Sequence, residues 1–209
     1  MITSREYWNR RSVIYDSKIG HIYHDAYERT IHMSRRYLNK TDYVLDLGCG
    51  TGIITVEIAP LVDRIRAIDV SEDMMSICRK KLESRGVKNV TLEQMSIFDS
   101  TLEDESFDVV CAYNILNYLN DRDDALERMY SILKPGGYFL SVTDCLGERL
   151  TRESMLKWYS KKRGEAPTIL FDTMKGLRSV IADAGFKILE SENVYSMPPN
   201  LFVAAKKPE

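Results

Sequence analysis

Two aspartates at the ends of apolar runs are the residues of this 209-residue chain whose type and spacing best support chemistry. Asp46 lies two residues before Gly48, which opens a series of alternating glycines with Gly50 and Gly52. Asp69 ends the next apolar run about 20 residues on, where a ribose-binding acid is expected. Alternating glycines let backbone N–H groups approach a ligand, and the helix expected after them adds its electropositive end. The pattern therefore predicts a site for a nucleotide-like ligand.

The position of Asp46 indicates the charge of that ligand. A carboxylate beside the centre of the ligand repels the pyrophosphate of NAD or FAD, because the effective dielectric of a half-buried site is low. A ligand with an ammonium or sulfonium group is favoured there. S-adenosylmethionine (SAM) carries both groups, and its ribose offers two hydroxyls to Asp69. A nicotinamide oxidoreductase is kept as the weaker alternative.

The segment Leu45–Gly52 resembles motif I of the class I, Rossmann-like SAM-dependent methyltransferases, and the resemblance extends over about residues 42–140. It implies SAM as the cofactor and methyl transfer as the activity. In the family's pattern, Asp69 bonds the ribose, Val70 and Met74 pack on the adenine, and Asp99 accepts from its amino group. The cofactor contacts expected in this way, with Tyr15 added from the N-terminal segment, are Tyr15, Asp46, Gly48, Cys49, Gly50, Asp69, Val70, Met74, Ser96, Ile97, Phe98, Asp99 and Tyr113.

Strand-like and helix-like patterns alternate along the chain, which is typical of a parallel sheet with helices on both faces. Ser71 is expected to cap one helix, and Gly86 to end it. The prediction is an α/β, doubly wound, mostly parallel seven-stranded sheet of the Rossmann-like kind, with an antiparallel last strand. Strands are expected over 43–47, 64–69, 90–93, 107–112, 138–143, 186–192 and 201–205, and helices over 53–59, 72–85, 121–133 and 171–184.

Two segments fall outside this alternation. We expect a single methyltransferase domain over 1–209, with an N-terminal helical cover (1–40), a cofactor-binding half (41–145), an insertion or lid (146–171), and a C-terminal helix and strands (172–209). Both added segments are rich in aromatic residues, which suits an apolar or planar methyl acceptor at the mouth of the site. The alternative is that these aromatic side chains only pack the extra helices onto the sheet.

Methyl transfer is an in-line displacement, so alignment of the reactants and exclusion of water supply most of the acceleration. A general base is needed only where the acceptor loses a proton, and the candidates are His21, Tyr23 and His24. Asn114 follows the fourth strand and is expected near the methyl group. The Asn/Asp-Pro-Pro-Tyr signature of amino-nucleobase methyltransferases is absent there, which disfavours DNA adenine as the acceptor.

Composition limits the partners. A net charge of −2 and a pI near 6.0 provide no overall attraction to nucleic acid or to an anionic membrane. The four cysteines form no C-x-x-C pair, so no metal is expected, and no apolar run approaches the ~18 residues of a membrane span. We expect a cytoplasmic monomer or homodimer with a small-molecule acceptor. An RNA or protein methyltransferase and a non-catalytic SAM-binding module stay open, the first because of the basic residues Arg149, Arg152, Lys157, Lys161, Lys162 and Arg163.

Overall fold

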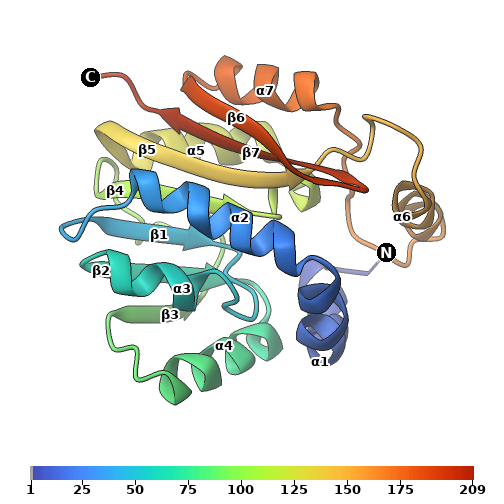
Figure 1. The fold of residues 1–209 in the computed structure, drawn as a ribbon, viewed down its shortest axis with the longest axis horizontal. Coiled ribbons are helices and arrows are strands. Elements are labelled where there is room, and N and C mark those ends of the chain that lie inside the picture. Colours follow the sequence, from blue (N-terminus) through green and yellow to red (C-terminus); the bar gives the residue numbers. More distant parts are fainter. Residues whose placement is uncertain (1) are drawn as a thin grey trace.

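The apolar runs assemble into one sheet with the strand order β3-β2-β1-β4-β5-β7-β6, in a computed structural model that describes residues 2–209. β1 to β5 pair in parallel, and β7 pairs antiparallel with both β5 and β6 (Figure 1). This confirms the doubly wound, mostly parallel sheet with an antiparallel last strand. The strands are β1 (Tyr43–Leu47), β2 (Arg64–Asp69), β3 (Val90–Gln94), β4 (Phe107–Tyr113), β5 (Leu133–Asp144), β6 (Lys187–Ser196) and β7 (Pro199–Lys206).

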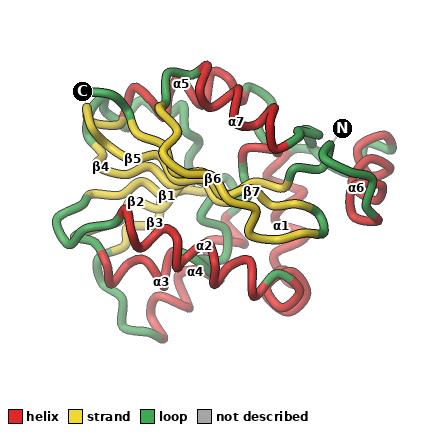
Figure 2. Tube along the Cα trace, turned by 45° about the horizontal axis from the view of Figure 1, so that its top comes forward, coloured by secondary structure: helices red, strands yellow, loops and turns green. Residues whose placement is uncertain are grey.

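Each face of the sheet buries its own core, because successive side chains of a strand point to opposite faces. Val44 belongs to the core under α2 and α3, and Leu45 to the core under α5 and α7. Figure 2 shows α5 and α7 on the side of the sheet opposite α2, α3 and α4. The helices are α1 (Ser4–Ile14), α2 (His24–Ser34), α3 (Thr55–Ile58), α4 (Glu72–Ser84), α5 (Arg122–Ile132), α6 (Arg152–Lys162) and α7 (Met174–Asp183).

Local signals set most of the element boundaries. The Ser71 hydroxyl accepts from the Met74 N–H at 3.2 Å at the start of α4, and Gly86 follows its end with φ of +65°. The helix expected over 53–59 is wrong in length. Only α3 is α-helical there, and a 3-10 turn containing Pro60 (Ala59–Leu61) follows it. β5 begins at Leu133 rather than at residue 138, because residues 134–137 belong to the strand, where its pairing with β4 shifts register.

The N-terminal segment covers the carboxyl ends of the parallel strands, beside the insertion that carries α6 (Figure 1). Between α1 and α2 it forms a π-helix over Tyr15–Gly20. Side-chain hydrogen bonds join α1 and the π-helix to the cofactor half: Asn9 Oδ1 accepts from the Ser71 hydroxyl at 2.6 Å, and Asp16 Oδ1 accepts from the Thr51 hydroxyl at 2.7 Å. Asp16 also pairs with Lys81 at 2.7 Å. α1 and the π-helix are thus held against the glycine turn by polar contacts.

Among the described residues, no helix is long and apolar enough to cross a membrane, and no group of three or more His, Cys, Asp or Glu side chains is placed to hold a metal ion.

Candidate functional site

The glycine turn lies after β1, where the chain order reverses between β1 and β4 and where ligands bind in open α/β sheets. Gly48, Gly50 and Gly52 all have left-handed φ, of +69°, +55° and +76°. A Cβ on Gly48 would lie 2.4 Å from Ile115 Cδ1, and one on Gly52 would lie 2.4 Å from Cys78 Sγ, so packing excludes side chains there. Gly50 differs, because a Cβ there would meet only the Gly48 carbonyl at 3.9 Å. Gly50 faces the cavities of the site.

Asp46 is buried at the end of β1, with 2% of its surface exposed. Its carboxylate accepts from the Thr55 hydroxyl at 2.6 Å. Burial raises the pKa of Asp46 to about 6, the Asp69 charge adds to that rise, and the Thr55 hydrogen bond opposes it. A nearby cation would offset this desolvation and favour the carboxylate form.

Asp69 ends β2 and joins the turn to α4. One carboxylate oxygen accepts from the Gly50 N–H at 2.9 Å, and the other accepts from the Ser71 N–H at 2.8 Å. Burial raises the pKa of Asp69, and these N–H groups oppose the rise. The two bonds hold the carboxylate at the wall of the cavity next to Val70.

Two connected hollows follow the turn. The larger, an open cavity of about 860 Å³, takes in β2, the loop after β3 and the end of β4, and the smaller, about 370 Å³, surrounds Asp46 and Cys49. Tyr15 and Tyr113 line both. The expected cofactor residues that line one or both are Tyr15, Asp46, Gly48, Cys49, Gly50, Asp69, Val70, Met74, Ser96, Ile97, Phe98 and Tyr113.

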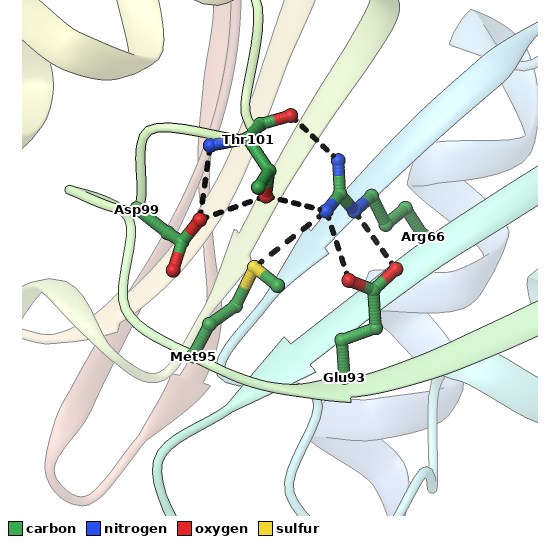
Figure 3. Close-up of polar contacts among 5 residues, drawn as sticks. All are labelled: Arg66, Glu93, Met95, Asp99 and Thr101. Carbon is green, nitrogen blue, oxygen red and sulfur yellow. Dashed lines mark hydrogen bonds and ion pairs between the residues drawn. The ribbon is translucent and has the colours of Figure 1, made fainter.

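Asp99 is the expected contact that the structure places outside the lining of these cavities. Its carboxylate turns back to accept from the Thr101 N–H at 2.9 Å and hydroxyl at 2.7 Å, and these bonds lower its pKa (Figure 3). Arg66 donates to both Glu93 oxygens, at 3.0 and 2.8 Å, and to the Thr101 hydroxyl at 2.8 Å. This network fixes the loop after β3 so that Ser96, rather than Asp99, faces the cavity.

Other lining residues escaped the sequence analysis as cofactor contacts: Ser4, Trp8, Met95, Ile115 and Tyr118. Trp8 and Tyr118 pack edge to face, with ring centroids 5.0 Å apart. The aromatic content of the N-terminal segment was a signal for Trp8. No local spacing pointed to Tyr118, because its partner Trp8 lies in α1, far away in the sequence.

A further cavity of about 740 Å³ adjoins the first two beneath α1, α2 and α6. Trp8, Tyr15, Asn114 and Tyr118 line both this cavity and the large one, so they stand at the boundary between them. The rest of its wall is aromatic on one side and polar on the other. The aromatic side chains are Tyr7, Trp8, Tyr15, Tyr23, Tyr27 and Tyr118, and the polar ones include Asp144, Glu153, Lys157 and Asn200.

A hydrogen-bonded chain crosses the polar side of this cavity. Lys157 of α6 donates to one oxygen of Asp144 at 2.7 Å, and Asn200 Nδ2 donates to the other at 2.7 Å. Asn200 Nδ2 also donates to Asn114 Oδ1 at 3.0 Å. Because Asp144 as a carboxylate can only accept, it orients the Asn200 amide, which in turn orients the amide of Asn114. Asn114 has φ of +56°, and because its amide oxygen accepts from Asn200, its amide nitrogen is directed away from Asn200.

Comparisons with known proteins agree with this geometry. A family model described as a methyltransferase domain matches residues 38–194, about three quarters of the chain. The chain belongs to the class I SAM-dependent methyltransferases. It is 29% identical over 178 residues to the ubiquinone/menaquinone biosynthesis C-methyltransferase UbiE of Pseudoalteromonas translucida, covering 75% of this chain and 71% of that one. Other curated relatives are matched over 39–51% of their own lengths.

Solved structures show the same fold. The complex between the Haloferax volcanii Trm112 methyltransferase activator and its methyltransferase partner matches with a TM-score of 0.80, 16% identity and full coverage of both chains. The DhpI–SAH complex matches with a TM-score of 0.76 and 22% identity over 98% of this chain and 95% of that one. As a SAM-dependent methyltransferase, the chain is neither a nicotinamide oxidoreductase nor a non-catalytic module.

The methyltransferase's candidate catalytic side chains divide into two groups. Tyr23 and Asn114 line the third cavity, whereas His21 and His24 lie outside it. Both histidines are exposed, and His24 lies 3.3 Å from Glu28 on the surface of α2. Burial raises the pKa of Tyr23 above its usual 10, so its hydroxyl stays protonated at neutral pH. The geometry therefore places the hydrogen-bond donors Tyr23 and Asn114, rather than a histidine base, in the third cavity.

The basic residues of the insertion do not form one solvated cationic face for nucleic acid. Lys157 is buried against Asp144, Lys161 donates to the Ile169 carbonyl at 2.8 Å, and Arg163 pairs with Glu165 at 2.7 Å. Arg149 donates to the Ser196 carbonyl. These internal contacts weaken the case for RNA as the methyl acceptor.

Proposed function

We propose that this enzyme transfers the methyl group of SAM to a small molecule held in the cavity beneath α1, α2 and α6, hereafter the acceptor cavity. The observation that carries the proposal is this third cavity, of about 740 Å³, joined to the large cofactor cavity across Tyr15 and Asn114. It lies behind two chain segments rather than in an open groove, and its lining combines six aromatic rings with a few polar groups, which is typical of a small-molecule site. A macromolecular acceptor would need a more open approach.

The cofactor contacts follow from the lining. We propose that Asp69 accepts from the ribose hydroxyls, that Asp46 faces the cationic end of SAM, and that Ile97 and Phe98 pack on the adenine. Phe98 is 52% exposed at the cavity wall, so a planar ring against it would bury apolar surface. When bound, SAM supplies an electrophilic methyl group.

The chain's own part in the reaction is to align the reactants and exclude water. α1 and the π-helix close the cofactor cavity through Trp8 and Tyr15. The amide nitrogen of Asn114, oriented through Asn200 and Asp144, donates to an oxygen or nitrogen of the acceptor. Tyr23 and Tyr27 supply an apolar wall for a planar acceptor. The relative named as a C-methyltransferase of ubiquinone/menaquinone biosynthesis is consistent with an aromatic acceptor.

A screen of metabolite pools for SAH release tests the proposal. Ala26 lines the acceptor cavity and neither cofactor cavity, so Ala26→Phe fills the acceptor cavity from α2. We expect turnover with the identified acceptor to be lost, while SAH still raises the melting temperature. Glu28→Phe, which adds the same ring on the exposed side of α2, is the matched control and keeps its activity. Full activity of Ala26→Phe, or turnover only with RNA or protein, contradicts the proposal.

A further inference from the structure

Helix α6 has the reverse of the usual arrangement, in which the apolar face of a helix packs on the core. The face that packs on the molecule is polar: Ser154 is its buried residue, and Glu153 and Lys157 line the acceptor cavity. Lys157 is held there by Asp144 at 2.7 Å. The apolar side chains of the helix point to solvent instead. Those of α6 and the residues before it are exposed by 82% (Leu150), 42% (Met155), 54% (Leu156), 46% (Trp158) and 59% (Tyr159).

Cations surround these apolar side chains. Residues 147–165 expose five basic side chains and two acidic ones, Glu148 and Glu165, which gives a local charge of +3 on a chain whose net charge is −2. The basic side chains are Arg149, Arg152, Lys161, Lys162 and Arg163. We call these cations and the five exposed apolar residues the α6 patch. Lys162 lies over the Trp158 ring, 4.9 Å from its centre, so charge and apolar surface are interleaved.

An apolar groove lies at the base of the α6 patch. α6 projects from the end of the sheet in both views of the molecule (Figures 1 and 2). Between it and the chain near Phe171 runs an open hollow of about 780 Å³, lined by Leu146, Leu150, Met155 and Trp158 among others. A projecting helix bearing Trp, Tyr, Leu and Met among Lys and Arg is suited to the boundary between lipid headgroups and acyl chains.

We infer that the α6 patch docks this enzyme on an anionic lipid surface. The exposed aromatic and aliphatic side chains insert at headgroup depth, and the cations bind the acidic headgroups. A second copy of the chain fits less well, because a two-fold contact would bring the cations of two patches together. RNA fits less well, because Leu150, Met155 and Leu156 lie exposed among the cations and offer a nucleic acid neither a stacking partner nor a contact to phosphate. The net charge of the chain does not reveal this surface, because the chain is negative overall and the α6 patch is positive.

Co-sedimentation of the full chain with vesicles tests the inference without any methyl acceptor, so its outcome is separate from that of the proposed function. We expect at least about tenfold stronger partitioning onto vesicles with about one third phosphatidylserine than onto pure phosphatidylcholine, weakened by added salt. Trp158 emission should be quenched by brominated acyl chains.

Two variants locate the contact. Trp158→Ser/Tyr159→Ser removes apolar surface, and Arg152→Glu/Lys162→Glu reverses charge; both should lower vesicle binding at least about tenfold. Lys80→Glu/Lys88→Glu makes the same charge change on exposed residues around α4 and should keep binding. An unchanged melting shift with SAH shows that each variant is folded. The inference is overturned by equal binding to neutral vesicles, by binding that survives both patch variants, by a dimer that the patch variants dissociate, or by RNA that outcompetes the vesicles.

Discussion

At the residue scale, the structure places two of the three expected acids, Asp46 and Asp69, in the lining of the cavities. Asp46 and Asp69 follow from local spacing, because a strand, a turn and a helix lie within about 30 residues of chain. Asp99 was expected to contact the cofactor, but its carboxylate accepts hydrogen bonds from Thr101 and lies outside the cavity lining. The hydrogen bonds that link Lys157, Asp144 and Asn200 join α6, β5 and β7, so no spacing in the sequence predicts them.

Asp69 and Asp99 should therefore differ sharply on substitution. Asp69→Ala removes a charged acceptor from the proposed ribose site, so we expect SAM affinity to fall by about 1.5–3 kcal/mol. Some stability is lost as well, because the N–H groups of Gly50 and Ser71 lose their acceptor. Asp99→Asn should leave affinity nearly unchanged. Titration calorimetry compares the two, and equal affinities of both variants would show that Asp69 serves only the turn.

Asp46 predicts a pH dependence of cofactor binding. Its pKa is raised to about 6 by burial, so part of the ligand-free protein is protonated there below neutral pH. SAM is cationic and favours the carboxylate, so its affinity should fall as the pH drops through about 6. Asp46→Asn keeps an acceptor for Thr55 and should bind weakly at every pH. A parent affinity that stays flat between pH 5 and pH 7.5, measured in steps of about half a unit, would contradict this assignment.

The same pKa has a consequence for stability. Between the ordinary pKa of 3.8 and the raised one, the folded protein holds a proton that the unfolded chain has released. The free energy of unfolding of the ligand-free protein therefore falls as the pH rises through this window, by about 3 kcal/mol from this group. Denaturant titrations of the parent and of Asp46→Asn give the free energy of unfolding at each pH. The difference between the two proteins isolates the contribution of Asp46, which should vanish in the variant.

At the element scale, the N-terminal segment consists of two unlike parts. α2 belongs to the core, since Tyr27 and Met33 pack with Val44 and Phe202 and the Ser34 hydroxyl bonds Tyr113 at 2.8 Å. α1 and the π-helix contact the cofactor half through the packing of Trp8 on Tyr118 and through the polar contacts of Asn9 and Asp16. The sequence predicted helices over 4–38 but not this division, because α1 shows little amphipathic pattern from which packing could be predicted.

Ligand binding should order only the first part. SAH fills the hollow beneath Trp8 and Tyr15, so amides of residues 4–20 should exchange more slowly with it, whereas those of α2 should change little. Hydrogen exchange read by mass spectrometry separates the two peptides. In Asp16→Ala, which loses its contacts to Thr51 and Lys81, the slowing should be smaller. Equal exchange with and without SAH would make α1 a static part of the fold.

At the scale of the whole molecule, the fold was predictable because each level of the sequence agrees with the others. The seven strand patterns, the helix caps and the glycine turn all indicate one doubly wound sheet, and the structure has this sheet. The sequence marks the two added segments as departures from the strand–helix alternation, but it does not report how they pack. α6 presents apolar residues to solvent, against the pattern by which core contacts are recognised, so its role depends on what lies outside the chain.

The coupling of cofactor binding to global stability can be measured with two glycines as a matched pair. Gly50 and Gly86 both have left-handed φ, +55° and +65°, and a Cβ would meet nothing closer than 3.9 Å at Gly50 and nothing within 4 Å at Gly86. Gly50→Ala and Gly86→Ala should therefore be destabilised alike, by about 1–2 kcal/mol of backbone strain. Of these two glycines, Gly50 lines the cofactor cavities and Gly86 does not.

SAM or SAH at a hundredfold excess over Kd should stabilise the parent by about 2.7 kcal/mol, because the ligand binds only the folded state. NAD should give no comparable shift, since Asp46 disfavours a pyrophosphate. Gly86→Ala should keep the full shift, and Gly50→Ala should lose most of it, because its methyl group occupies ligand space. Melting curves of the three proteins with each ligand decide the matter: a full shift in Gly50→Ala would move the cofactor away from the turn after β1.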